Sequence, residues 1–502
     1  MPMLLPTTPA FLRLQARRQG DAGGVAFRDR RHAFGALADA AEDLARMLAR
    51  RGAGAGDRVA VAAANEPAIV AMLWAVWGLG AVAVPVGVRA TADEAARLLA
   101  HARACALLAD GDRADLARAA AGATGLPALV CDPDLPLRAR LHRRAAARRV
   151  PRPGRAPRPD DLAAIAYTSG TTGAPKGVML THANLLWATL ACGQARGDGP
   201  DGVGACLSPL THVPVLVSHL LCRVLVGATA VLVEKFDVAA VLEAVERHGV
   251  TDLPLIGGMV FDVVARGAVP AAVRRTVEKV SVGGAPTPME SKRALAAIFE
   301  GAEIIEAYGQ TESTDGVTMA RGPAVFDRPG TVGRANPFVA VRTLGAPGEE
   351  GEIVVGGPTV MRGYWRDPAA TAAAIRDGWL HTGDLGRQDA DGFVYVTGRV
   401  KEVIISGGEN VSPAEVEDVL RAHPEVADVA VIGTPHPRLG EQVTAVVVRR
   451  DGSAVDAAAL VAFAGARLAG FKKPRRVEFV AALPRNAANK VQVGLLRERF
   501  AS

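Results

Sequence analysis

The stretch Ala164–Leu180 (AIAYTSGTTGAPKGVML) carries side chains suited to holding a phosphate. An apolar run leads into a loop of glycine and hydroxyl residues, and Lys176 follows that loop. Glycines let backbone amides approach a phosphate, hydroxyls donate hydrogen bonds, and a lysine adds positive charge. The segment is not a Walker loop, because Gly177 follows Lys176 where a Walker loop has Ser or Thr. The loop residues predicted to contact phosphates are Thr168, Ser169, Gly170, Thr171, Thr172 and Gly173.

Two further polar segments follow apolar runs that are typical of strands. The run Val280–Val282 ends in a Gly-Gly-Ala-Pro turn, and residues 307–312 are AYGQTE. In the second segment Tyr308 can stack on a base, Thr311 can donate to a phosphate, and Glu312 can hold a hard cation such as magnesium. Each segment alone is weak evidence, because glycine turns after strands are common.

Three segments nearer the C-terminus complete the set of polar candidates. Residues 379–384 are WLHTGD, and Asp384 offers a carboxylate suited to a ribose diol. Residues 398–402 are GRVKE, and the tail at 483–490 is LPRNAANK. A lysine in a polar loop, such as Lys490, is ordinarily a solvated side chain, so its position alone assigns it no role.

Length and composition restrict the class of protein that these residues serve. A chain of 502 residues, 49% hydrophobic and 22% charged, is typical of a globular protein with about two to four domains. A net charge of +6 is too small at this length to require nucleic acid. Five scattered cysteines without a CxxC pair favour free thiols in a reducing cytoplasm.

One apolar stretch invites a membrane interpretation. Residues 68–88 carry no charge, but Gly78, Gly80 and Pro85 interrupt them. We therefore expect a buried helix, a turn and a buried strand rather than a membrane span. The N-terminus lacks the charged-then-apolar pattern of an export signal.

The elements that position the polar segments are predicted to alternate between helix and strand. Such alternation favours parallel sheets covered by helices. We predict a helix at 34–51, parallel strands at 57–63, 106–109 and 128–131, and antiparallel strands with glycine turns at 351–357 and 392–397. The Arg- and Pro-rich residues 137–161 are interpreted as a solvated linker.

From Lys401 onward the pattern changes to a compact unit of mixed helix and strand. A helix is predicted at 413–421, and strands are predicted at 426–432 and 442–449. We place a domain boundary near Arg399–Glu402, which separates residues 1–400 from residues 401–502.

The ordered set YTSGTTGAPKG, YGQTE, HTGD and GRVKE resembles the adenylate-forming enzymes. This family includes acyl-CoA synthetases, firefly luciferase and the adenylation domains of peptide synthetases. The runs IISGGENVSPAEVE and LPRNAANKVQ are most similar to aryl-CoA ligases of the 4-chlorobenzoate type, and malonyl-CoA synthetases are also similar there. The resemblance implies an α/β fold: a large N-terminal domain of parallel sheets with helices and a β-barrel-like subdomain, and a small mobile α+β C-terminal domain.

The resemblance also implies a reaction and a role for each matched residue. A carboxylate and ATP give an acyl-adenylate and pyrophosphate, and coenzyme A then takes the acyl group and releases AMP. Glu312 is expected to hold Mg²⁺, while Lys490, Lys176, Thr311 and His212 join it in the catalytic set. The residues expected around AMP are Gly284, Ala285, Pro286, Tyr308, Gly309, Gln310, Asp384 and Arg399.

In this family the small domain rotates between the two half-reactions, and Lys401 occupies the hinge position. Lys490 would act in the adenylation state. After rotation Gly407, Gly408 and Glu409 would line the pantetheine tunnel instead. By similarity with the chlorobenzoate ligases, the candidates for the CoA nucleotide are Arg89, Phe471, Lys473 and Arg475.

The family's acyl pocket corresponds to a mostly apolar set of residues in this chain. These are His212, Val213, Pro214, Ile256, Gly257, Gly258, Met259, Thr314 and Asp315. The set has no arginine for a second carboxylate, which favours a bulky apolar or aromatic monocarboxylate over malonate. Asp315 either faces solvent or recognises a polar group of the substrate. Thr211 and Val215 depart from the family pattern, which usually has an aromatic residue and a glycine there.

Two other functions stay open. One is a stand-alone adenylation enzyme that loads a carrier-protein thiol, and the other is a half-reaction enzyme that uses only acyl-adenylate and CoA. The tunnel residues and Arg89 favour free CoA. A nucleophilic hydrolase is disfavoured, because no GxSxG elbow occurs. The expected partners are a carboxylic acid, ATP and CoA, without nucleic acid, and a homodimer stays open.

Overall fold

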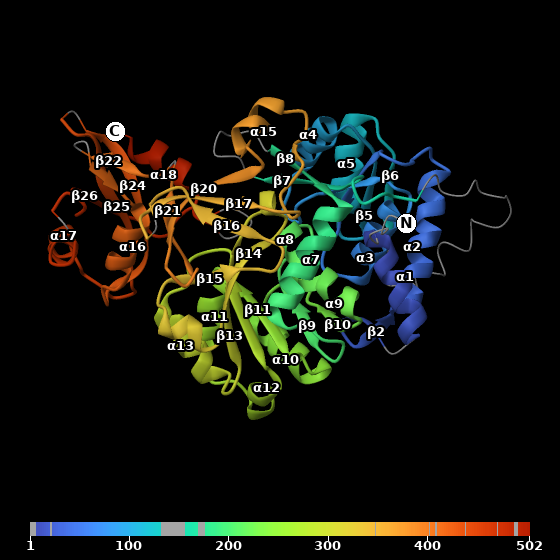
Figure 1. The fold of residues 1–502 in the computed structure, drawn as a ribbon, viewed down its shortest axis with the longest axis horizontal. Helices are drawn as coiled ribbons and strands as arrows, with labels where there is room; N and C mark the ends of the chain where they lie inside the picture. Colours follow the sequence, from blue (N-terminus) through green and yellow to red (C-terminus); the bar gives the residue numbers. More distant parts are fainter. Residues whose placement is uncertain are drawn as a thin grey trace. The chain divides into compact units, whose positions relative to one another are not determined.

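The computed structural model describes residues 7–20, 23–131, 156–168, 176–346, 348–400, 402–406, 409–436, 438–468, 470–485 and 490–501. The chain divides by its contacts into two compact units. Unit 1 comprises Met1–Val341 and Val355–Leu380, and unit 2 comprises Arg342–Val354 and His381–Ser502. The labels of their helices and strands are those of Figure 1.

The first sheet of unit 1 carries the phosphate-loop candidate. Its strand order is β18-β8-β7-β4-β3-β5-β6, and the strands from β7 to β6 are parallel. Strand β8 is antiparallel to β7, and β18 is antiparallel to β8. The bounds are β3 Arg58–Ala62, β4 Val82–Pro85, β5 Ala104–Asp110, β6 Ala128–Cys131, β7 Leu162–Thr168, β8 Lys176–Thr181 and β18 Gly363–Tyr364.

Helices pack on this sheet as the alternating pattern predicts. Helix α2 (Phe34–Ala49) and helix α3 (Pro67–Gly78) pack against each other, and Pro67–Trp77 is buried throughout. The charge-free stretch therefore forms a buried helix followed by the buried strand β4, as predicted. Within the part of the chain that the structure describes, no helix is long and apolar enough to cross a membrane.

The second sheet of unit 1 follows the order β15-β14-β13-β12-β11-β9-β10-β1-β2. Its strands from β13 to β1 are parallel, and helices α10 (Val238–His248), α11 (Gly258–Arg266), α12 (Ala271–Thr276) and α13 (Met289–Ile298) accompany them (Figure 1). The bounds are β1 Gly24–Phe27, β2 Arg30–Ala33, β9 Val203–Cys206, β10 Thr229–Leu232, β11 Asp252–Ile256, β12 Lys279–Gly283, β13 Glu303–Gly309, β14 Gly316–Arg321 and β15 Thr331–Ala335. Buried Val, Leu, Ile and Phe side chains fill the space between this sheet and its helices.

Unit 2 contains two strand groups. The order β16-β17-β20-β21 is formed by Ala340–Thr343, Gly351–Gly356, Trp379–Gln388 and Val394–Arg399, and the chain passes between the units within the first three of these strands. The other sheet has the order β23-β22-β25-β24, with β26 beside β25. Its strands are β22 Ile404–Ser406, β23 Glu409–Val411, β24 Val426–His436, β25 Gly440–Arg449 and β26 Arg476–Phe479, with helices α16 Pro413–Arg421, α17 Ala457–Gly465 and α18 Val493–Phe500.

The contact boundary differs from the boundary expected from sequence. Residues 381–400 pack with the residues that follow them in unit 2. Ser412 Oγ donates to the Thr397 carbonyl oxygen at 2.5 Å, and α16 packs against β21. The predicted division near Arg399–Glu402 therefore stays a prediction about which parts of the chain move. That the N-terminal domain contains a β-barrel-like subdomain also stays a prediction. The mixed α/β class, with a large N-terminal and a small C-terminal domain, is confirmed.

Candidate active site

Three loops of unit 1 emerge from the same edge of its second sheet. The parallel register of β11, β12 and β13 pairs Ile256 with Gly283 and Gly283 with Ala307. The loops that follow these residues therefore start side by side at the carboxyl ends of the strands. Ligands of open α/β sheets bind at this edge. The fold thus brings together the Gly283–Pro286 turn and the AYGQTE segment, which the sequence predicted only as separate candidates.

The glycines of this edge are required by close backbone approach. A Cβ at Gly283 would lie 2.5 Å from the carbonyl oxygen of Ala307. Gly284 has a φ of +72°, and a Cβ there would lie 2.9 Å from Cγ2 of Ile256. Side chains at either position would separate the strands or strain the turn. The two glycines therefore let the three strand ends lie close together, and binding of a base beside Tyr308 stays a prediction.

The phosphate-loop candidate joins two paired strands. Thr168 ends β7 and is the cross-strand partner of Lys176, which begins β8. The hairpin register therefore fixes both ends of the loop and the place of Lys176. Ser169, Gly170, Thr171, Thr172 and Gly173 lie outside the described residues, so their phosphate contacts stay a prediction.

Lys176 and Glu312 meet at a tyrosine that sequence reasoning missed. The ammonium of Lys176 lies 5.0 Å from the ring centroid of Tyr364. The hydroxyl of Tyr364 donates to Oε1 of Glu312 at 3.0 Å. Burial, together with the negative charge of Glu312, raises the pKa of Tyr364, so its hydroxyl remains a donor at neutral pH. The one sequence signal for this residue is its place in the short run MRGYW after an apolar strand.

The turn after Glu312 is held from inside the unit. Residues Thr311–Ser313 form a short 3₁₀ turn, and Thr314 follows with a φ of +69°. Thr314 is fully buried, and its hydroxyl donates to the Thr359 carbonyl oxygen at 2.5 Å. These contacts fix the backbone on which Thr311 and Glu312 stand.

Asp315 does not face solvent. Its carboxylate accepts from Ser218 Oγ and, at 3.4 Å, from Sγ of Cys192. Burial raises the pKa of Asp315 to about 6, although these two donors and Arg196 oppose the rise. Its carboxylate is therefore engaged by the protein, and recognition of a polar substrate group by Asp315 stays untested.

The predicted acyl-pocket segment packs against this turn. His212 precedes the short helix α8 (Val213–Val215), which continues into a π-helical turn, Leu216–Leu221, that carries Ser218. Val213 is buried, whereas Pro214 is half-buried. The Ser218–Asp315 hydrogen bond joins this segment to the residues that follow Glu312. Two walls of the predicted pocket are thereby brought into contact.

The other predicted wall contains two glycines with different backbones. Gly257 has a φ of +56°, whereas Gly258, which begins α11, is not among the glycines with positive φ. Ile256, Gly257, Gly258 and Met259 are all half-buried. The positive φ explains Gly257 as a turn residue. Gly258 has no positive φ, so a side chain at this position would not strain the backbone for that reason.

In unit 2, Asp384 and Arg399 are direct cross-strand partners. Arg399 Nε donates to Asp384 Oδ1 at 2.9 Å. The carboxylate of Asp384 is 6% exposed and the guanidinium of Arg399 is 46% exposed. The two residues expected around AMP in this unit are therefore direct neighbours, and their contact with a ribose stays a prediction. One partner is held rigidly within the sheet, and the other reaches toward solvent.

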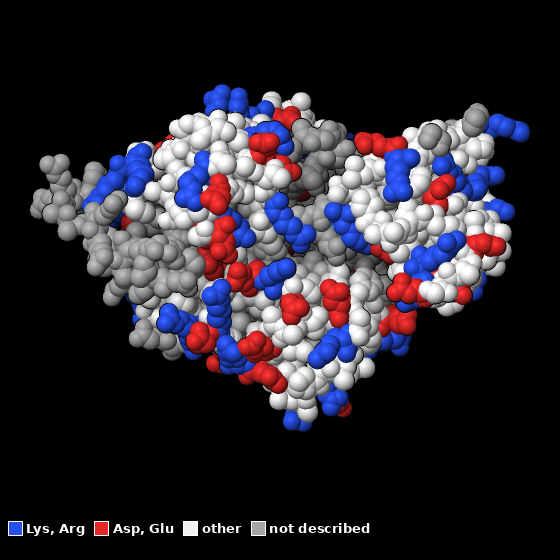
Figure 2. Space-filling model, turned by 180° about the vertical axis from the view of Figure 1, so that it is seen from behind, with Lys and Arg blue, Asp and Glu red and all other residues white. Residues whose placement is uncertain are grey.

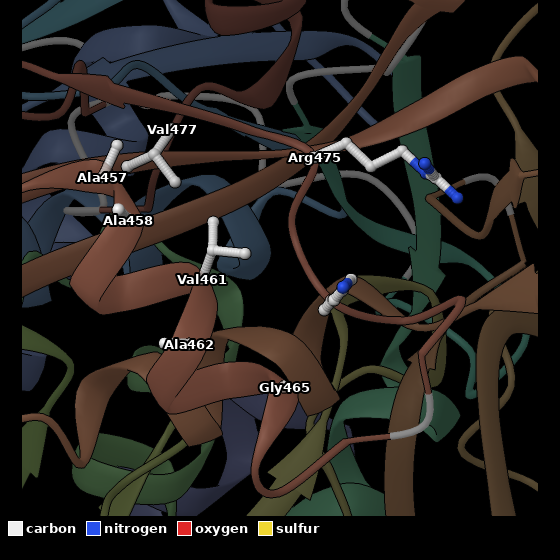
Figure 3. A pocket seen from close by; sticks show the side chains of 8 residues that line it. Ala457, Ala458, Val461, Ala462, Gly465, Arg475 and Val477 are labelled. Carbon is white, nitrogen blue, oxygen red and sulfur yellow. The ribbon is translucent and has the colours of Figure 1, made fainter.

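Two of the predicted CoA-binding residues line a hollow of unit 2. Figure 3 shows Val461 of α17 and Val477 of β26 on its apolar side, while the side chain of Arg475 extends away from them. Lys473 is the second cation that lines this hollow. Phe471 is 37% exposed nearby in sequence. In unit 1, Arg89 is exposed after β4.

The remaining predicted residues of unit 2 lie partly outside the described chain. Lys401, Gly407 and Gly408 are not described, and neither is the side chain of Glu409. Lys490 is exposed and is followed by Val491, which forms a bridge with Arg485. Gln492 N donates to the Pro484 carbonyl oxygen at 2.8 Å. The residues on either side of the Lys490 loop are therefore hydrogen-bonded to each other.

Charges of both signs are mixed on the surface of the molecule. Figure 2 shows Lys and Arg side chains interspersed with Asp and Glu over the described parts of the face that it presents. The described parts of that face therefore carry no field of one sign.

Comparison with known proteins places the chain in a family. Residues 12–365 match the AMP-binding enzyme family, and residues 415–490 match the AMP-binding enzyme C-terminal domain. The chain belongs to the AMP-binding enzyme family. The match covers β7, β8, β12, β13 and Tyr364 of unit 1, so the strand-end loops and the Lys176–Tyr364–Glu312 contacts all lie within the family region.

Members of this family similar to the chain include acid–CoA ligases. Feruloyl-CoA synthase of an Amycolatopsis species is 38% identical over 471 residues, which cover 91% of each chain. Indoleacetate–CoA ligase of Aromatoleum aromaticum is 34% identical over 490 residues, or 95% of each chain. O-succinylbenzoate-CoA synthetase of Bacillus subtilis, solved with ATP and a magnesium ion, matches at a TM-score of 0.84 with 28% identity over 98% of this chain and 99% of that one.

Proposed function

We propose that the protein is an AMP-forming acid–CoA ligase that acts on a bulky apolar or aromatic monocarboxylic acid. The comparisons support ATP-dependent formation of an acyl-CoA. The observation that carries the proposal is the Lys176–Tyr364–Glu312 cluster beside the carboxyl end of β13. This cluster places a cation and a carboxylate next to the loops suited to a nucleotide.

The charges of the site suit the first half-reaction. Attack of a carboxylate on the α-phosphorus of ATP brings two anions together, and positive charge must offset their repulsion. Lys176 supplies such a charge from a fixed strand position. Thr311 would donate to the α-phosphate, and Lys490 would bridge the carboxylate and phosphate oxygens. Asp384, held by Arg399, would accept hydrogen bonds from the ribose hydroxyls.

Glu312 is suited to the magnesium ion that accompanies ATP. Tyr364 donates to Oε1, so the direction of the carboxylate is fixed while Oε2 keeps its lone pairs. No cluster of three or more His, Cys, Asp or Glu side chains that could hold a metal occurs among the described residues. The single carboxylate of Glu312 fits Mg²⁺, because this ion is usually held by one or two carboxylates together with substrate phosphates. The bound ion would neutralise charge that develops on the phosphates.

The substrate class rests on the apolar walls of the predicted pocket. Val213 is buried there, and Ile256 and Met259 of the other predicted wall are half-buried. The nearby buried guanidinium of Arg196 bonds to Asp198 and to the Ser218 carbonyl oxygen, so it is not available to a second substrate carboxylate. Feruloyl-CoA synthase and indoleacetate–CoA ligase, both named for aromatic acids, are consistent with this choice.

The second half-reaction would use the residues predicted in unit 2. Rotation about Lys401 would withdraw Lys490 and bring Gly407, Gly408 and Glu409 to the acyl-adenylate. The exposed Lys473 and Arg475, together with Arg89, are suited to the phosphates of CoA. A cytoplasmic location is supported by the use of ATP and CoA as cosubstrates. It is also supported by free thiols, which are those of Cys105, Cys192, Cys206 and Cys222.

A substrate screen tests the function. The purified full chain is incubated with ATP, Mg²⁺, CoA and single acids from an aromatic, alicyclic and fatty panel. AMP, pyrophosphate and acyl-CoA are then quantified by mass spectrometry. Equal amounts of AMP and acyl-CoA from a bulky acid are expected. Pyrophosphate release without acyl-CoA would favour loading of a carrier-protein thiol, and acyl-CoA formed only from supplied adenylate would favour a half-reaction enzyme.

A further inference from the structure

Opposite charges lie close together in unit 1 without forming an ion pair. Lys176 and Glu312 both contact Tyr364, the lysine through the ring face and the glutamate through the hydroxyl. No ion pair joins Lys176 to Glu312 within the part of the chain that the structure describes. Such charges ordinarily gain by pairing when they are partly buried. The neutral side chain of Tyr364 is the contact that both charges share.

The backbone of Tyr364 is held firmly enough for this role. Tyr364 pairs with Val178 across β18 and β8, which places it beside the strand that Lys176 begins. Its amide donates to Oγ1 of Thr371 at 2.8 Å. The amide of Met361, in the same segment, donates to the carbonyl oxygen of Glu312 at 2.9 Å. The segment is thus bound both to the lysine strand and to the glutamate turn.

We propose that Tyr364 is a positioning residue that keeps Lys176 and Glu312 close but unpaired, so that the lysine is available to a phosphate and the glutamate to a divalent cation. This role rests on the proposed function, because it assumes that Mg²⁺ and ATP are ligands of the site. A direct Lys–Glu pair would have to be broken before either ligand bound. The hydroxyl of Tyr364 bonds to Oε1 of Glu312, so Oε2 keeps its lone pairs for a cation, and the cation–π contact leaves the N–H donors of Lys176 for a phosphate.

The two contacts of Tyr364 can be removed one at a time. Tyr364→Phe removes the hydroxyl and keeps the ring, whereas Tyr364→Leu removes both. Tyr395 provides a matched control, because its hydroxyl donates to Asp389 Oδ2 at 3.1 Å and Arg387 lies 4.0 Å from its ring centroid. Tyr395→Phe therefore deletes the same kind of contact at a place with no proposed role in the reaction.

Each variant is measured by calorimetric titration with ATP in EDTA, by titration with Mg²⁺ in the presence of ATP, and by ATP–pyrophosphate exchange. For Tyr364→Phe, the Mg²⁺ concentration at half-saturation should rise about tenfold, while ATP affinity in EDTA stays within about twofold. Tyr364→Leu should also lose about fivefold in ATP affinity without metal, because Lys176 is no longer held. Tyr395→Phe should leave both affinities within about twofold.

Two outcomes would overturn the proposal. One is a Tyr364→Phe variant whose Mg²⁺ and ATP affinities match those of Tyr395→Phe. The other is an equal loss with and without metal, accompanied by a lower melting temperature, which would indicate a purely structural tyrosine. If Tyr364→Leu does not fold, Tyr364→Phe alone decides. Absence of exchange by the wild type with any acid would instead contradict the proposed function, and the binding titrations would still test Tyr364.

Discussion

Charged side chains of unit 1 are treated in two opposite ways. Arg196 and Arg223 are buried, and each pairs with both Asp198 and Asp252. Complete pairing is what burial of charge requires, since an unpaired buried ion is costly. Lys176 and Glu312 are instead held through a neutral tyrosine. At the scale of single residues, the Arg–Asp cluster is satisfied within the protein, whereas Lys176 and Glu312 are the charges proposed to bind a ligand.

Lys490 should serve one half-reaction only. We expect Lys490→Ala to slow adenylation by roughly a hundredfold or more, because a charge that acts at the transition state is lost. Thioester formation from supplied acyl-adenylate and CoA should be retained, since the proposed rotation about Lys401 would remove Lys490 from the site. Separate quenched-flow assays of the two halves measure this difference. Lys235→Ala, an exposed lysine of unit 1, is the control, and equal loss in both halves would contradict the two-state role.

Asp315 should make stability depend on pH. Its pKa of about 6 in the folded protein lies above the ordinary value of 3.8, so the folded state holds the proton more tightly between these values. The free energy of unfolding contributed by Asp315 therefore falls as pH rises through this window. Asp315→Asn cannot ionise, so its free energy of unfolding does not fall with pH for this reason. Between pH 4.5 and 7.5 the variant should gain about 2 kcal/mol relative to the wild type.

Urea unfolding of both proteins at several pH values measures this difference. Other buried carboxyls titrate in both proteins alike and cancel in the comparison. Parallel curves for the wild type and Asp315→Asn would show that the carboxyl titrates normally despite its burial.

At the scale of elements, much of the arrangement could be predicted from sequence. The helix predicted at 413–421 is α16, and the predicted strand at 128–131 is β6, because regular apolar spacing reports local structure directly. Tyr364 could not be found in this way, since its partner Glu312 is 52 residues distant and Lys176 lies on another strand. The engaged state of Asp315 was also hidden, because Ser218 and Cys192 reach it only in the folded chain.

The start of α11 offers a test of pocket size. Gly258→Val should lower kcat/KM for the best bulky acid by a factor that corresponds to about 1–3 kcal/mol, because a packed wall does not absorb an added isopropyl group. Benzoate-sized acids should be little affected. Gly257→Val is the matched variant: its φ of +56° makes any side chain strained, so all acids should suffer alike and the melting temperature should fall. Kinetics with one large and one small acid, together with melting curves, separate the two cases.

Equal losses for both acids in Gly258→Val would show that this glycine does not line the acyl pocket. A lower melting temperature in that variant would assign Gly258 to the turn rather than to the pocket wall. Unchanged kinetics for both acids would place the acyl group elsewhere along the strand ends.

At the scale of the whole molecule, two boundaries compete. Contacts within the structure divide the chain between Leu380 and His381, whereas the family resemblance places the hinge at Lys401. The first boundary describes which residues pack together in one state. The second describes where the backbone turns between states. Ser412 and Thr397 are hydrogen-bonded across position 401, and rotation about that position would have to break or carry this contact.

Lys401→Pro distinguishes these boundaries. Proline fixes φ near −65° and removes the amide hydrogen, so a hinge at this residue could no longer turn. Pyrophosphate release and acyl-adenylate formation should persist, while transfer to CoA falls by roughly a hundredfold. Lys401→Ala, which removes the same side chain and leaves the backbone free, should retain both halves. Quantifying adenylate and acyl-CoA in single-turnover reactions of the two variants measures the effect. Full overall activity of Lys401→Pro would move the hinge away from this residue, and the segment around Leu380 and His381 would then be the next place to introduce a proline.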